Sequence, residues 1–149
     1  MFNFLIYLYV MCSTSTPAGF ILRKIKEGLP YDESIKRLLI MALDEQTFEL
    51  NMSSEAILFT LPDAKELLFH YLDGRHKTLW LTFNGENLLI GTAEYEDLLF
   101  SYIEKRALDE DVQKLMFTHK NAQKLVKFHF EKQGLSPKIK HQAEKLGWL

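Results

Sequence analysis

An internal repeat is the feature that most constrains the fold of this chain. Residues 47–75 and 78–106 align without a gap after a shift of thirty-one positions, and identical pairs are more frequent than composition alone would give. The identical pairs include Thr47/Thr78, Glu55/Glu86, Leu58/Leu89, Leu67/Leu98, Leu68/Leu99, Phe69/Phe100, Tyr71/Tyr102 and Arg75/Arg106. The alignment therefore indicates one supersecondary unit that is used twice.

Each copy is predicted to be two strands followed by a helix. In the second copy Asn84-Gly85 tolerates the positive φ angles of a type I′ turn and so predicts a β-hairpin. Thr92 then caps a helix whose apolar positions recur at helical spacing. These positions are Tyr95, Leu98, Leu99, Tyr102 and Ile103. In the first copy Ser53-Ser54 takes the place of the turn, so both copies are predicted as ββα units.

The N-terminal residues 1–45 resemble a degenerate third unit. Ser34–Glu45 aligns with the helix predicted for Asp63–Gly74, and a Leu-Pro pair precedes both segments. Upstream, the apolar run Phe2–Met11 fits either a core strand or a targeting segment. The sequence leaves both interpretations open for residues 1–18.

These patterns together predict a single α+β domain over residues 1–149. We expect an antiparallel sheet built from repeated ββα units, two of them clear, with helices on one face. Residues 108–149 are predicted to form a helical tail, with helices that start near Asn121 and at Ser136-Pro137. The apolar run is shorter than the ~20 residues that cross a bilayer, so no membrane span is expected. The single cysteine, Cys12, suits a reducing compartment, and the protein is expected to be cytoplasmic.

Charge is distributed unevenly along the chain. The net charge of −2 conceals values of +2 for residues 1–43, −10 for residues 44–113 and +6 for residues 114–149. The two repeats are therefore acidic, and the predicted helical tail is basic.

No strong catalytic motif occurs in the sequence. The densest polar cluster, His70 with Asp73, Arg75 and His76, has residue types that can bind a metal or move a proton. A histidine near a helix C-terminus also interacts favourably with the helix dipole, and this structural role is preferred. We therefore expect no enzymatic activity, no cofactor and no metal.

The first functional hypothesis is a protein-binding module, such as an inhibitor, an adaptor or an immunity-type regulator. Trp80 and Leu89 are predicted to lie together on the open face of the sheet, where an aromatic set in a polar surface is typical of a binding hot spot. The acidic side chains Glu94, Glu96 and Asp97 would form a second contact surface. An unpaired sheet edge would also allow a homodimer.

The alternative hypothesis is a nucleic-acid-binding protein that uses the lysine-rich tail. Lysine side chains neutralise phosphates, and aromatic rings stack on bases. The residues assigned to this surface are Lys120, Lys124, Lys127, Lys138, Lys140 and Trp148. The tail contains no arginine, which weakens this hypothesis because arginine is favoured for bidentate phosphate and base contacts.

Overall fold

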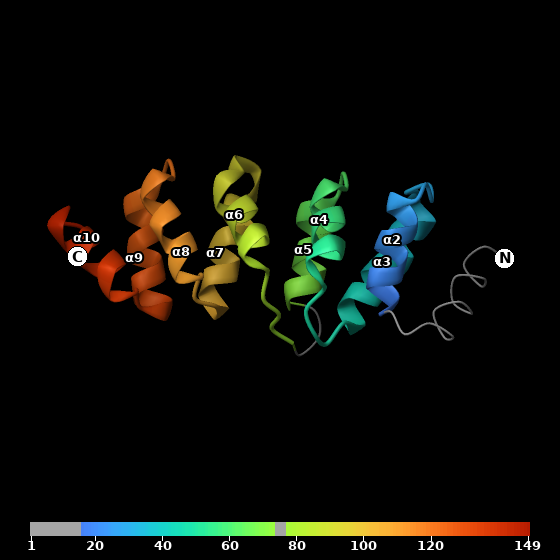
Figure 1. Ribbon diagram of the computed structural model, residues 1–149, viewed down its shortest axis with the longest axis horizontal. Helices are drawn as coiled ribbons and strands as arrows, with labels where there is room; N and C mark the ends of the chain where they lie inside the picture. Colours follow the sequence, from blue (N-terminus) through green and yellow to red (C-terminus); the bar gives the residue numbers. More distant parts are fainter. Residues whose placement is uncertain (1–15, 74–76) are drawn as a thin grey trace. The chain divides into compact units, whose positions relative to one another are not determined.

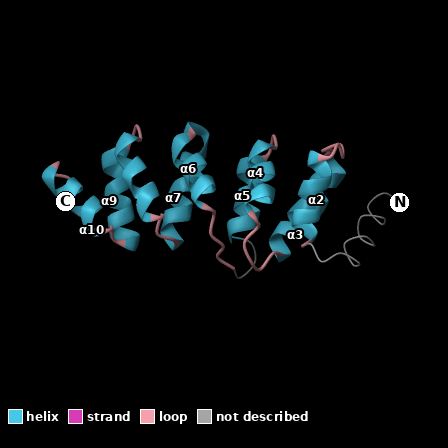
Figure 2. Ribbon diagram, in the orientation of Figure 1, coloured by secondary structure: helices cyan, strands magenta, loops and turns pink. Residues whose placement is uncertain are grey.

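The computed structural model describes residues 16–73 and 77–149, and helices connected by loops and turns make up these two ranges (Figure 2). Neither range contains a β-strand. The predicted α+β fold with an antiparallel sheet is therefore wrong for the described residues. The predictions for the apolar run Phe2–Met11, and for Arg75 and His76, lie outside these residues.

The chain divides into two compact units after Trp80, and each unit is described by itself. The helices of the first unit are α2 (Pro17–Lys26), α3 (Glu33–Glu45), α4 (Met52–Thr60) and α5 (Ala64–Asp73) (Figure 1). Helix α2 packs against α3, and α4 packs against α5. The two pairs also stack on each other, because α2 contacts α4 and α3 contacts α5. This stacking of helix pairs is how helical repeats bury a continuous core.

The described residues of the second unit are also helical. Its elements are α6 (Phe83–Gly91), the 3₁₀ helix η1 (Ala93–Tyr95), α7 (Glu96–Lys105), α8 (Glu110–Gln113), the 3₁₀ helix η2 (Lys114–Thr118), α9 (Ala122–Gln133) and α10 (Pro137–Lys145). Helix α7 packs against both α6 and α9, and η2 packs against α6 and α9. The predicted helices of the tail are thus confirmed as α9 and α10.

The hairpin predicted at Asn84-Gly85 is wrong because these residues form the first turn of α6. The side chain of Thr82 accepts a hydrogen bond from the Gly85 amide at 3.2 Å and so caps the helix. In the first copy Asn51 caps α4 through the Ser54 amide at 2.8 Å, which also overturns the predicted Ser53-Ser54 turn. In both places the N-cap outweighs the local turn signal.

The thirty-one-residue shift nevertheless relates equivalent contacts in the two copies. The Leu50 amide donates to the Tyr71 hydroxyl at 2.7 Å, and the Leu81 amide donates to the Tyr102 hydroxyl at 3.1 Å. In both copies a loop before the first helix is tied to the second helix by a buried hydrogen bond. The repeat is therefore a helix pair preceded by an extended loop.

Tyr102 is also the centre of a buried polar network in the second unit. Its hydroxyl donates to Glu86 at 2.5 Å, and the other Glu86 carboxylate oxygen accepts from the Asp109 amide at 2.9 Å. The fully buried Arg106 guanidinium lies 4.7 Å from the centre of the Tyr102 ring. Burial, and then the Glu86 carboxylate, raise the pKa of Tyr102 well above its usual range. The hydroxyl consequently stays protonated and keeps donating.

Tyr102→Phe is expected to lower the free energy of unfolding by about 1–3 kcal/mol, because it leaves the buried Leu81 amide and Glu86 without their hydroxyl partner. Urea denaturation measures this change. Tyr31→Phe is the matched control, since the Tyr31 hydroxyl donates to a half-buried Asp63 at 3.0 Å. It should cost less than about 1 kcal/mol, and equal losses in the two variants would contradict the proposed importance of the network.

A buried histidine joins α9 to two loops of the second unit. The His129 side chain is fully buried, its Nε2 accepts from the Leu108 amide at 3.0 Å, and its Nδ1 donates to the Gly134 carbonyl at 2.7 Å. An imidazole that accepts at one nitrogen and donates at the other is neutral. Burial lowers the pKa of His129 in agreement with this arrangement.

The stability of the protein is therefore expected to fall as the pH drops below about 6.5, the ordinary pKa of histidine. Below that value the unfolded chain binds a proton at this position while the folded chain resists it, so protonation favours unfolding. Urea midpoints between neutral and mildly acidic pH measure the effect. His129→Gln should flatten this dependence, whereas His141→Gln, at an exposed position on α10, should leave it unchanged. An NMR titration in which His129 becomes protonated at the ordinary pKa would contradict the expectation.

Candidate interaction surfaces

The structure does not form the surface predicted to hold Trp80 and Leu89. Leu89 is completely buried within α6, and Trp80 lies in the loop before α6 with 43% of its area exposed. Since the described residues contain no sheet, the two side chains do not share a sheet face. Leu89 is a core residue, whereas Trp80 remains accessible to a partner.

The acidic residues predicted for protein binding have different environments. Glu94 in η1 and Asp97 in α7 are exposed. Glu96 accepts a hydrogen bond from the side chain of Asn121, which lowers the pKa of Glu96, and it also pairs with Lys120 at 3.6 Å. Glu96 therefore connects the start of α7 to the segment that precedes α9, and these contacts reduce its availability to a partner.

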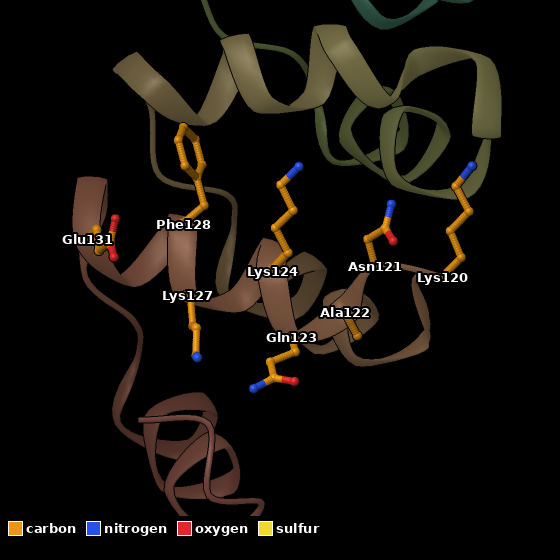
Figure 3. Close-up of a pocket in the computed structure, with 8 residues that line it drawn as sticks. All are labelled: Lys120, Asn121, Ala122, Gln123, Lys124, Lys127, Phe128 and Glu131. Carbon is orange, nitrogen blue, oxygen red and sulfur yellow. The ribbon is translucent and has the colours of Figure 1, made fainter.

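Only some of the basic residues assigned to the nucleic-acid-binding surface lie close together. Lys120, Lys124 and Lys127 line a shallow hollow of about 600 Å³ along α9, together with Phe128 and Glu131. Figure 3 shows Lys120 and Lys124 directed toward α7, and Lys127 on the opposite side of α9. The remaining residues of the set lie in or after α10, where the Lys140 ammonium is 5.7 Å from the Phe130 ring centre and Trp148 stacks on Phe117.

Lysines in and beside this hollow are already engaged by the same unit. Lys120 pairs with Glu96, and Lys132 on α9, which does not line the hollow, pairs with Glu104 at 3.2 Å. The ammonium of Lys124 lies 5.2 Å from the ring centre of Phe100 on α7. Basic side chains of α9 thus compensate acidic side chains of α7, which reduces the charge available to an external polyanion.

A surface that sequence analysis missed surrounds Phe48 in the first unit. Phe48 is 56% exposed and Met52 is 59% exposed, although both are large apolar residues. Trp80 is close by, because its amide donates to the Glu49 carboxylate at 3.4 Å. We call these three side chains, Phe48, Met52 and Trp80, the Phe48 surface.

The loop that carries Phe48 is held on both sides of this residue. The buried Gln46 side chain donates to the Phe48 carbonyl at 2.7 Å, and the Leu50 amide donates to the Tyr71 hydroxyl. Asn51 then caps α4. Hydrogen bonds therefore fix the backbone before and after Phe48, while the ring itself is left in solvent.

Two hollows border the Phe48 ring. One has a volume of about 410 Å³ and includes Arg23, Lys26 and Ile57 in its walls. The other has a volume of about 290 Å³ and includes Pro17, Ala42 and Glu45. The ββα unit predicted for residues 47–75 would place Phe48 on the strand before the Ser53-Ser54 turn, whereas the structure places it in the loop before α4, where the available sequence signal was the Asn51 cap.

In the polar cluster considered for chemistry, His70 has a structural role, and Asp73 is the last residue of α5. The Nδ1 of His70 lies 2.8 Å from the Asp44 carboxylate and so joins α5 to α3. Across residues 16–73 and 77–149, no three histidine, cysteine or acidic side chains gather in a way that could hold a metal ion. Over the same ranges, no helix is long and apolar enough to cross a membrane.

Comparisons of this chain with known protein families, with curated proteins and with solved structures find no match. The functional argument therefore depends on the surfaces described above.

Proposed function

We propose that this protein is a protein-binding module, acting as an adaptor or an inhibitor, and that the Phe48 surface contacts its partner. The observation that carries this proposal is the exposure of Phe48 on a loop whose backbone is fixed by Gln46 and Tyr71. A large apolar side chain held in solvent by a rigid scaffold is the usual composition of a binding hot spot.

The energetics favour binding at this position. Burying a phenylalanine side chain contributes about 1.5–3 kcal/mol, and Met52 and Trp80 are further large apolar side chains that are exposed in this unit. Ordering a flexible loop would oppose this gain, at about 0.5–1.5 kcal/mol for each immobilised side chain. Because the loop is already tied to α5 through Tyr71, the cost of ordering its backbone is largely met during folding.

Selection from a random peptide library displayed on phage tests the proposal, with the intact chain as the target. The selected peptides are expected to bind the wild-type protein and to lose about tenfold or more of their affinity for Phe48→Ser, as measured by fluorescence anisotropy. The matched control is Leu146→Ser, because Leu146 is also an exposed apolar residue, at 52%. Unchanged affinity for Phe48→Ser, or the absence of any enriched peptide, would contradict the proposal.

The lysine-lined hollow of α9 supports a second candidate function, nucleic-acid binding. Lys120, Lys124 and Lys127 line this hollow together with Phe128, which matches the lysine and aromatic content of a single-strand binding surface. The pairing of Lys120 with Glu96 and the contact of Lys124 with the Phe100 ring rank this candidate below protein binding.

A salt series with mixed-sequence single-stranded DNA tests the second candidate. If α9 binds phosphates, affinity should fall steeply as salt rises, and the double variant Lys124→Ala/Lys127→Ala should reduce the salt slope. Lys114→Ala, outside this hollow and paired with Asp111 at 3.2 Å, is the control that should leave the slope unchanged. An equal slope in the wild type and the double variant would exclude this surface.

A further inference from the structure

We infer that the partner segment bound at the Phe48 surface is apolar and acidic, with an apolar side chain against Phe48 and a neighbouring carboxylate against Arg23 and Lys26. This inference rests on the proposed function and specifies the chemistry of the partner. Its basis is the charge and shape of the hollow of about 410 Å³ that borders Phe48.

The hollow combines an apolar wall with a basic one. Phe48 and Ile57 supply apolar surface, and Arg23 and Lys26 come from the last turns of α2. Residues three apart on a helix lie on the same side, so the two basic groups face the hollow together. Its volume falls within the range of about 300–1,000 Å³ that is usual for ligand pockets.

The two basic groups have no carboxylate partner in the described part of the chain. The nearby ion pair on α2 joins Lys24 to Glu27 at 3.3 Å and involves neither Arg23 nor Lys26. The Arg23 guanidinium instead lies 5.6 Å from the ring centre of Phe20, a contact that leaves its N–H donors available. An incoming carboxylate can therefore accept hydrogen bonds from Arg23 without displacing an internal ion pair.

Among the described residues that line this hollow, Glu49 is the one with a carboxylate, and it accepts a hydrogen bond from the Trp80 amide at 3.4 Å while keeping its negative charge. With two basic side chains and one acidic one, the lining has an excess of positive charge and favours a negatively charged segment over a positively charged one. The second hollow beside Phe48 contains Glu45, and none of the described residues that line it is basic. The carboxylate of the partner is therefore placed on the α2 side of Phe48.

Three synthetic peptides test this inference against the intact protein. The first has one Phe between Asp and Glu residues, the second has Asn and Gln in their place, and the third has Lys. The acidic peptide is expected to bind about tenfold more tightly than the neutral one, and the basic peptide is expected to bind least. The preference should weaken as salt rises, because the basic groups are exposed.

Charge reversal identifies the groups responsible. Arg23→Glu is expected to weaken binding of the acidic peptide by about tenfold and to strengthen binding of the basic peptide. Arg37→Glu is the matched control, because Arg37 is an exposed arginine on α3 outside the hollow. It should leave both affinities unchanged.

The outcomes separate the inference from the proposed function. If all three peptides bind equally and all lose affinity for Phe48→Ser, the proposed function stands and the acidic preference is overturned. If the acidic peptide binds but neither Phe48→Ser nor Arg23→Glu changes its affinity, both are overturned at this surface. If no peptide binds and the phage selection also yields none, the proposed function fails together with the inference.

Discussion

The structure of each repeat depends on a buried hydrogen bond between a loop amide and a tyrosine hydroxyl. A buried amide without a partner costs about 1–3 kcal/mol, so the loop before α4 or α6 can pack inward only if the following helix pair supplies an acceptor. Tyr71 and Tyr102 supply it to Leu50 and Leu81. The hydroxyl of Tyr102 in turn donates a hydrogen bond to Glu86, which also accepts one from the Asp109 amide of the next segment.

This constraint explains how one loop presents Phe48. Gln46 and Leu50 are buried, and hydrogen bonds from the Gln46 side chain and the Leu50 amide fix the backbone of the loop. Phe48, which lies between them in the chain, is exposed. The surface that results combines an exposed aromatic ring with the basic end of α2. The surface that we propose for protein binding thus depends on the same contacts that build the repeat. The lysines of α9 differ in that internal carboxylates already satisfy part of their charge.

The sequence revealed the thirty-one-residue repeat but not the secondary structure of the repeated unit. The pairs Glu55/Glu86 and Tyr71/Tyr102 mark equivalent buried positions, and this could be predicted because identical residues at a fixed shift need no knowledge of secondary structure. The strands were wrong because α4 and α6 are short, and their apolar residues run consecutively, as in Ile57-Leu58-Phe59. Periodicity does not distinguish such a segment from a strand. The caps at Asn51 and Thr82 were the deciding signal.

Phe48 was missed because outward exposure of an apolar loop residue depends on tertiary hydrogen bonds that the sequence does not display.

Amide hydrogen exchange at Leu50 and Leu81, measured by NMR on the full chain, tests the central claim most directly. Both residues precede their helices, so secondary structure alone gives them no protection. If the tyrosine hydroxyls hold these loops, both amides should exchange as slowly as the helical core, while the exposed neighbours Thr47 and Thr78 exchange rapidly. Rapid exchange at Leu50 and Leu81 would show that the loops are not fixed, and it would remove the basis for a preformed Phe48 surface.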